Sequence, residues 1–140
     1  MVHQNWEALI NRFHDEELEV RIEAVKVVAQ MVRVSKTFVY RRVRQQMWPL
    51  VEKWMREAST HTYSSTSAAY KYQLTILQNI ADIFIGIDTV PEDVQMVLKL
   101  LSLYTTKMGN PQLKKEAESS KKRLEEYLEE KKKSAEEEMR

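Results

Sequence analysis

Apolar residues recur along this chain with the period of an α-helix. They are spaced three and four residues apart in six blocks, which places them on one face of each helix. The blocks are 6–13, 17–34, 36–58, 67–85, 89–107 and 111 onward. The pattern therefore predicts an all-α chain of six helices in three helical hairpins.

Residues with strong local preferences mark the predicted helix ends. Ser35 is placed to cap the third helix, and Pro49 inside that helix lacks an N–H group and predicts a kink near 45–48. The Ser- and Thr-rich run 59–67 has no helical period and predicts a loop. Gly86 is expected to end the fourth helix in the left-handed conformation.

The last two helix starts also carry capping signals. Thr89, followed three residues later by Glu92, matches a capping box at the start of the fifth helix. Gly109, Asn110 and Pro111 supply in succession a helix stop, an N-cap and a first-turn proline. Both signals predict short connections between helices.

The hairpins repeat at a regular interval. Their second helices begin near residues 17, 67 and 111, about 44 to 50 residues apart, which is close to the period of HEAT and armadillo repeats. We therefore expect a HEAT/armadillo-like α-solenoid segment over residues 1–128 and a charged helical tail over 129–140. The hairpins are expected at approximately 5–34, 36–86 and 90–128. The alternative is a compact helical bundle with a small-molecule pocket between its helices.

The second and fourth helices are apolar over most of their circumference and carry one narrow polar stripe each. Such a helix has to be covered on several sides, as the stacking of repeats provides. The stripes consist of Glu19, Glu23, Lys26, Gln30 and Arg33, and of Lys71, Thr75, Gln78 and Asp82. Because second helices usually line the concave face of such arrays, we expect the stripes to form a protein-binding ridge.

The two ends of the array differ in character. The last helix has one apolar face and an otherwise charged surface, which is typical of a terminal repeat without a further neighbour. The first hairpin retains apolar surface. The spacing of Trp6, Trp48 and Trp54 favours core packing, and Trp6, near the end of the chain, is the one of the three that a further element would cover. The sequence thus predicts the C-terminal piece of a longer array, or a second subunit over the first hairpin.

Composition argues against catalytic chemistry. The 140 residues include two glycines and no cysteine, which excludes disulfides, thiolate zinc sites and cysteine nucleophiles. No glycine-rich phosphate loop or serine nucleophile motif is present. The histidines, His3, His14 and His61, lie far apart on predicted helix ends or loops, so no two of them stand at the spacing of a helical zinc site. We therefore expect a non-enzymatic protein without cofactor or metal.

Charge is balanced over the whole chain but not along it. Lys and Arg number 22 against 21 Asp and Glu, which gives no bulk attraction to nucleic acid or to a membrane. No stretch predicts a secretory signal or a membrane span, so we expect a soluble protein of the cell interior. The basic helix 36–56 carries Arg41, Arg42 and Arg44 among aromatic residues, a pattern suited to phosphate contacts. A nucleic-acid-binding HEAT domain is therefore the alternative function.

A more specific pattern extends over residues 43–128. It comprises Val43, Trp48-Pro49-Leu50, Tyr70-Lys71-Tyr72-Gln73-Leu74 with Leu77 and Ile80, the apolar spacing from Val94 to Leu103, and Leu113 with Glu116-Ala117. This order and spacing resemble the C-terminal region of the Tel-two-interacting protein one family, the large HEAT-repeat scaffolds of the Triple-T co-chaperone complex.

The resemblance implies a non-enzymatic scaffold of the cytoplasm and nucleus. Its implied partners are the two sister subunits of the Triple-T complex and, through them, the heat-shock chaperone machinery. Together these proteins help to assemble and stabilise phosphatidylinositol-3-kinase-related kinases. Residues 129–140 depart from the family pattern, so the resemblance implies no function for the tail.

Overall fold

The computed structural model describes residues 2–106 and 110–139, with the side chains of 2–5 and 36–38 left out. The helices in this part are α1 (Val2–Arg12), α2 (Leu18–Val34), α3 (Lys36–Arg42), the π-helical η1 (Val43–Met47), α4 (Trp48–Ala58), α5 (Ala68–Gly86), α6 (Pro91–Thr106) and α7 (Pro111–Glu138). Because α3, η1 and α4 are continuous, the described chain forms six helical rods. The all-α class and the order of helices are confirmed, whereas the exact division into repeats stays a prediction.

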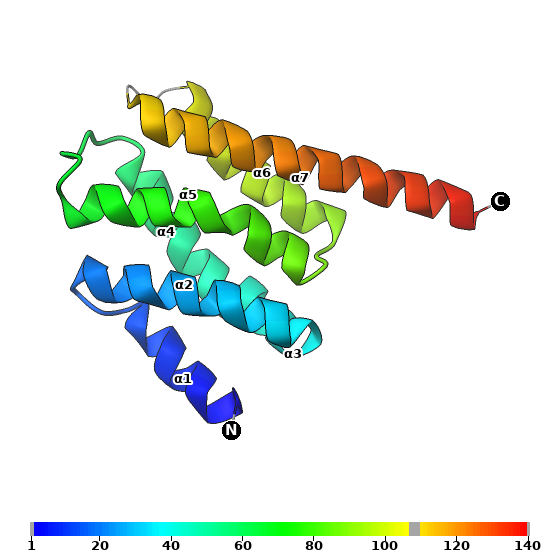
Figure 1. The fold of residues 1–140 in the computed structure, drawn as a ribbon, viewed down its shortest axis with the longest axis horizontal. Coiled ribbons are helices and arrows are strands. Elements are labelled where there is room, and N and C mark those ends of the chain that lie inside the picture. The colour runs from blue at the N-terminus through cyan, green and yellow to red at the C-terminus, as the bar shows by residue number, and fades with distance from the viewer. Residues whose placement is uncertain (1, 107–109, 140) are drawn as a thin grey trace.

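The helices form two layers (Figure 1). In one layer α2, α5 and α7 lie side by side, with α5 between the other two. In the other layer α4 packs against both α5 and α6, and α6 in turn packs against α7. At the N-terminal end, α1 packs against α2. The neighbours of α5 explain why its sequence is apolar around most of its circumference.

One continuous apolar core runs between the layers. It extends from Trp6 through Trp48 and Phe84, whose ring centroids lie 5.3 Å apart edge to face, to Leu128. Trp6 is 1% exposed, and its indole N–H donates to the side-chain oxygen of Gln46 at 2.5 Å. The core packing favoured for Trp6 and Trp48 is therefore confirmed, and the alternative that a further element covers Trp6 is wrong, because this side chain is already buried within the described fold.

Pro49 changes the hydrogen-bonding register of the third predicted helix. Without an N–H group, Pro49 leaves the carbonyl of Gln45 without its usual helical donor. Just before it, η1 forms a π-helical turn, in which the N–H of Trp48 bonds to the carbonyl of Val43, five residues back. The irregularity predicted here is thus present as a wider turn, which changes the side chains that face each neighbouring helix.

Gly86 does not end α5 in the left-handed conformation. It is the last residue of α5 and does not have a positive φ, whereas Asp88 has a φ of 53°. A Cβ atom at Gly86 would overlap with Cγ1 of Val32 on α2. The prediction was wrong because close packing of α5 on α2, and not a backbone dihedral, requires glycine here. The predicted stop at Gly109 lies outside the described residues.

One of the three predicted N-caps is confirmed. The side chain of Asn110 accepts the N–H groups of the second and third residues after it, at 2.9 and 3.1 Å. Ser35 makes no side-chain cap bond, since its dihedrals (φ −145°, ψ 69°) depart from those of an N-cap. The hydroxyl of Thr89 donates to Asp93 at 2.6 Å, so the capping box with Glu92 is wrong.

The predicted Ser- and Thr-rich loop 59–67 connects α4 and α5. The hydroxyls of Ser59 and Thr60 donate to backbone carbonyls three residues earlier, at 2.7 and 2.8 Å. Ser67 accepts the N–H of Tyr70 at 3.2 Å and caps α5. As the sequence indicated, these side chains form hydrogen bonds with backbone groups of the loop and the adjoining helix ends, and these bonds stabilise the non-helical connection.

Candidate protein interaction surface

The polar stripe of α2 is accessible over its whole length. Its exposed side chains are Glu19, Glu23, Lys26, Gln30 and Arg33. The Nζ atom of Lys26 lies 3.4 Å from Oε1 of Glu23, and the two side chains are 54% and 67% exposed. A pair that is this exposed to solvent adds little to the stability of the fold. Both charges therefore stay accessible to a binding partner. The stripe runs from acidic at the start of α2 to basic at its end, which also complements the helix dipole.

An apolar groove opens beside this stripe, between α1 and the second half of α2. It encloses about 470 Å³ and is lined by Ala8, Leu9, Arg12, Val27, Gln30, Met31, Val34 and Ser35. Gln30 belongs to both the stripe and the groove, and Val34 is 88% exposed. We call the stripe and the groove together the α2 surface. An amphipathic segment that docks here buries apolar side chains in the groove and pairs its charges with the stripe.

The polar stripe of α5 is only partly accessible. Lys71 and Gln78 are exposed, but Thr75 is buried and its hydroxyl donates to the carbonyl of Lys71 at 2.8 Å. The carboxylate of Asp82 pairs with Arg123 of α7 at 2.5 Å. Thr75 is therefore not available to a partner, because the neighbours of α5 cover it, and Asp82 serves the packing of α7.

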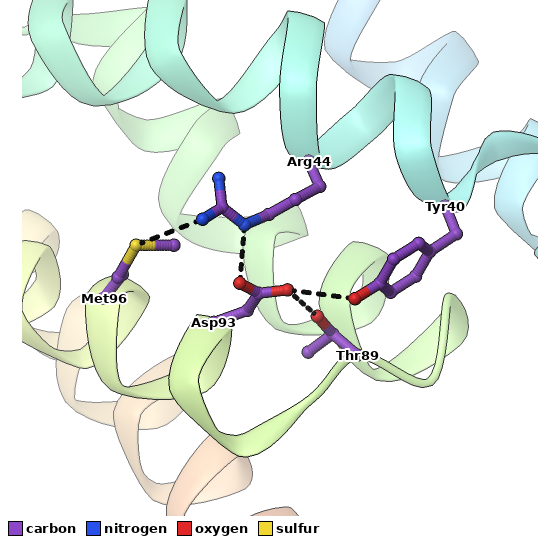
Figure 2. Close-up of polar contacts among 5 residues, drawn as sticks. All are labelled: Tyr40, Arg44, Thr89, Asp93 and Met96. Carbon is purple, nitrogen blue, oxygen red and sulfur yellow. Dashed lines mark hydrogen bonds and ion pairs between the residues drawn. The ribbon is translucent and has the colours of Figure 1, made fainter.

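The arginines of the alternative basic patch do not share one open surface. Arg41 is exposed and Arg42 is half-buried, whereas Arg44 reaches α6. Nε of Arg44 donates to Oδ1 of Asp93 at 2.5 Å, and its Nη2 lies 3.7 Å from the sulfur of Met96 (Figure 2). A guanidinium held in this way is not available to a phosphate.

Asp93 is the centre of the polar network in Figure 2. Asp93 is 4% exposed, and its carboxylate accepts hydrogen bonds from Arg44, from Thr89 at 2.6 Å and from Tyr40 at 3.3 Å. These partners join α3 and η1 to the start of α6. A buried carboxylate needs such donors, because an unpaired charge inside a protein is strongly destabilising.

Sequence reasoning missed this network. One signal was present, since Asp93 precedes Val97 and Leu100 by four and seven residues and so falls on the apolar face of its helix. A charged residue on an apolar face predicts a buried partner of opposite charge. The sequence pattern alone does not identify this partner. In the structure it is Arg44, which lies 49 positions before Asp93.

Two tyrosines in the core have raised pKa values. Burial raises the pKa of Tyr72 to about 12, with Arg21 partly offsetting the effect. Burial likewise raises the pKa of Tyr104, whose hydroxyl donates to the carbonyl of Met55 at 2.7 Å and lies 3.1 Å from the side-chain amide of Gln73. Both hydroxyls stay protonated at neutral pH, so they serve the core as hydrogen-bonding groups.

Comparison with protein families supports a helical scaffold. The family described as the TTI1 C-terminal TPR domain matches residues 1–137. The chain belongs to the TTI1 C-terminal TPR domain family. The resemblance over 43–128 is confirmed, and the match also includes the first hairpin and most of the tail that the sequence pattern had set apart. Comparisons with curated proteins and with solved structures gave no match.

Membership of this TTI1 family fits the layered hairpins. Domains of the TPR type are helical-repeat scaffolds that bind other proteins and are usually non-catalytic. Across residues 2–106 and 110–139, no helix is long and apolar enough to cross a membrane. The same residues contain no group of three or more His, Asp or Glu side chains arranged to hold a metal ion.

Proposed function

We propose that this chain is a non-enzymatic protein interaction scaffold and the C-terminal part of a co-chaperone subunit. With its two sister subunits in the Triple-T complex, and through them the heat-shock chaperone machinery, it helps to assemble and stabilise phosphatidylinositol-3-kinase-related kinases. These partners place the protein in the cytoplasm and the nucleus. Membership of the TTI1 C-terminal TPR domain family supports the subunit role.

The α2 surface is the observation that carries this proposal. It combines an apolar groove with five exposed polar side chains on one helix. We assign it to a sister subunit of the Triple-T complex. That partner supplies a helix with an apolar stripe for the groove, basic residues opposite Glu19 and Glu23, and an acidic residue opposite Arg33 or Arg12.

Exchanging the charges of Glu23 and Lys26 is expected to weaken binding of the sister subunits about tenfold, since position 23 then carries a positive charge opposite a basic residue of the partner. The Glu23→Lys/Lys26→Glu variant keeps an ion pair between the same positions, so the free energy of unfolding should change by less than about 0.5 kcal/mol. Affinity capture of the sister subunits on the tagged parent protein measures the first effect, and urea denaturation the second.

The matched control exchanges two exposed charges on α7, in the variant Lys114→Glu/Glu118→Lys. This pair lies away from the α2 surface, so the control should capture the sister subunits like the unmodified protein. Equal capture by all three proteins would show that the partner does not use the α2 surface.

Nucleic acid is expected not to bind. With Arg44 paired to Asp93, the basic patch loses a cation, and the chain carries a formal net charge of only +1. Fluorescence anisotropy of labelled duplex DNA and RNA should stay flat as the chain is added at low salt. Binding that weakens steeply with salt and is lost in Arg41→Ala/Arg42→Ala would establish the nucleic-acid alternative instead.

A further inference from the structure

The two ends of the α2 surface carry opposite charges. At the basic end, Arg33 is exposed in the last turn of α2, and Arg12 of α1 lines the groove that runs beside this half of the helix. The acidic end comprises the turn before α2 and the first two turns of the helix. Its exposed carboxylates are Glu16, Glu17, Glu19 and Glu23. The surface therefore has a direction, and a helix bound along α2 follows it in one of two ways.

The apolar part of the α2 surface lies at the basic end. The α2 residues that line the groove run from Val27 to Ser35, all in the second half of the helix. Val34 is exposed, and Val27 and Met31 are half-buried. A helix bound along α2 therefore buries its own apolar side chains in the half that faces the basic end. Its other half lies over the carboxylates of Glu19 and Glu23.

The helix dipole determines which end of the bound helix lies over each half. Acidic side chains are stabilising in the first turn of a helix and basic side chains in the last turn, because they offset the partial charges of the helix ends. The helix α2 follows this rule with Glu19 and Arg33. A partner helix with basic residues over Glu19 and acidic residues over Arg33 obeys the rule only if its last turn lies over the start of α2. This antiparallel alignment also brings dipole ends of opposite sign together.

We propose that the bound segment of the sister subunit is one helix that runs antiparallel to α2, with an acidic first turn, an apolar stripe in its first half and a basic last turn. This inference rests on the proposed assignment of the α2 surface to a sister subunit, and it adds the direction, the charge order and the length of the helix. Glu19 and Arg33 are 14 positions apart, which corresponds to about 21 Å of helix. The bound helix therefore spans about four turns.

A parallel helix fits the same charges less well. It needs basic residues in its first turn to pair with Glu19 and Glu23, and acidic residues in its last turn to pair with Arg33. Both positions are unfavourable for the dipole of that helix. The charges that bind α2 would then destabilise the helix that carries them.

A second copy of the chain has the right charge order but the wrong apolar half. If α2 of the second copy lies antiparallel, Glu19 of each copy meets Arg33 of the other. The apolar residues from Val27 to Val34 of each copy then face the acidic half of the other, whose exposed side chains are carboxylates. The groove stays unfilled in this arrangement, so the occupant is a helix with its apolar stripe in the first half.

Photo-crosslinking from both ends of the α2 surface tests the direction. The photoreactive residue p-benzoylphenylalanine replaces Glu19 or Arg33 in the tagged parent protein, and the complex with the sister subunits is irradiated and analysed by mass spectrometry. Both probes should link to one helix of one sister subunit, and the residue linked from position 33 should precede the residue linked from position 19 by about 14 positions. The matched control carries the probe at Glu118, which is exposed on α7, and should not link to that helix.

Every other pattern of links overturns the inference, and the patterns differ in what they mean for the proposed function. The reverse order would establish a parallel helix, and links to two separate segments would exclude a single helix. In both cases the sister subunit still binds the α2 surface. Links to a second copy would make this surface a contact between copies. If neither position links to a sister subunit in a complex that still forms, the proposed function of the surface fails together with the inference.

Compensating charge reversals test the charge order independently. Glu19→Lys should lower capture of the sister subunit about fivefold, because the new lysine faces a basic residue. Changing a basic residue in the last turn of the bound helix to glutamate should restore capture to within about twofold, whereas changing an acidic residue in its first turn to lysine should not. The control variant Glu118→Lys should capture the sister subunit normally. Restoration by the first-turn change instead would overturn the antiparallel direction.

Discussion

Replacing Asp93 by alanine is expected to lower the free energy of unfolding by about 3 kcal/mol. The change removes the acceptor of three donors and leaves the guanidinium of Arg44 without a counter-charge. We expect the lower end of the range for buried ion pairs, because the side chain of Arg44 is still 35% exposed. Urea denaturation followed by circular dichroism measures the loss.

Asp82 provides the matched control for this prediction. It forms an ion pair with Arg123 of the same length, 2.5 Å, but the two side chains are 39% and 46% exposed. Solvent screens this pair, so Asp82→Ala should lower the free energy of unfolding by about 0.5 kcal/mol. If Asp93→Ala and Asp82→Ala unfold at the same urea concentration, the buried ion pair of Asp93 contributes no more to stability than the exposed ion pair of Asp82. The double variant Arg44→Met/Asp93→Leu should recover most of the loss, because no charge is then left unpaired.

Adding a methyl group at Gly86 is expected to lower the free energy of unfolding by about 2 kcal/mol. The new Cβ atom would overlap with Cγ1 of Val32, so α5 and α2 would have to move apart. An alanine in a helix is normally more stable than a glycine, and the predicted sign is therefore opposite to that of helix propensity. The midpoint of thermal or urea unfolding of Gly86→Ala shows which effect dominates.

Val32→Ala tests the cause of this loss. Alone it should destabilise the chain by about 2 kcal/mol, because it leaves a cavity where the side chain was buried. In Gly86→Ala/Val32→Ala, the methyl group of residue 86 occupies that space. The combined loss should then fall at least about 1 kcal/mol short of the sum. Additive losses would mean that Gly86 is required for a reason other than contact with Val32.

Much of the fold follows from the sequence because it depends on local patterns. The spacing of apolar residues defined the helices, and the apolar circumference of the fourth predicted helix correctly indicated that α5 is covered on both sides. The N-cap of α7 at Asn110 and the loop 59–67 needed only neighbouring residues. Pro49 located the irregular turn of its helix, since a missing N–H group acts within a few residues.

The failed caps at Ser35 and Thr89 are local, whereas the other failures concern contacts between residues distant in sequence. Gly86 looked like a left-handed helix stop, but its role depends on Val32 in another hairpin. The burial of Trp6 depends on Gln46 and the turn around it, which the pattern of the first helix does not contain. Neither polar stripe alone showed which of its residues a partner can reach, because Arg123 of α7 pairs with Asp82 whereas the stripe of α2 stays exposed.

The π-helical segment η1 has a mechanical consequence for the whole array. Gln46 of this segment accepts the indole N–H of Trp6 on α1, and Arg44, two positions earlier, donates to Asp93 on α6. One wide turn thus connects the first hairpin to the third. If the two ends of the chain are pulled apart, separating the first hairpin from the third requires these two side-chain bonds to break, so η1 contributes to the resistance of the array to stretching.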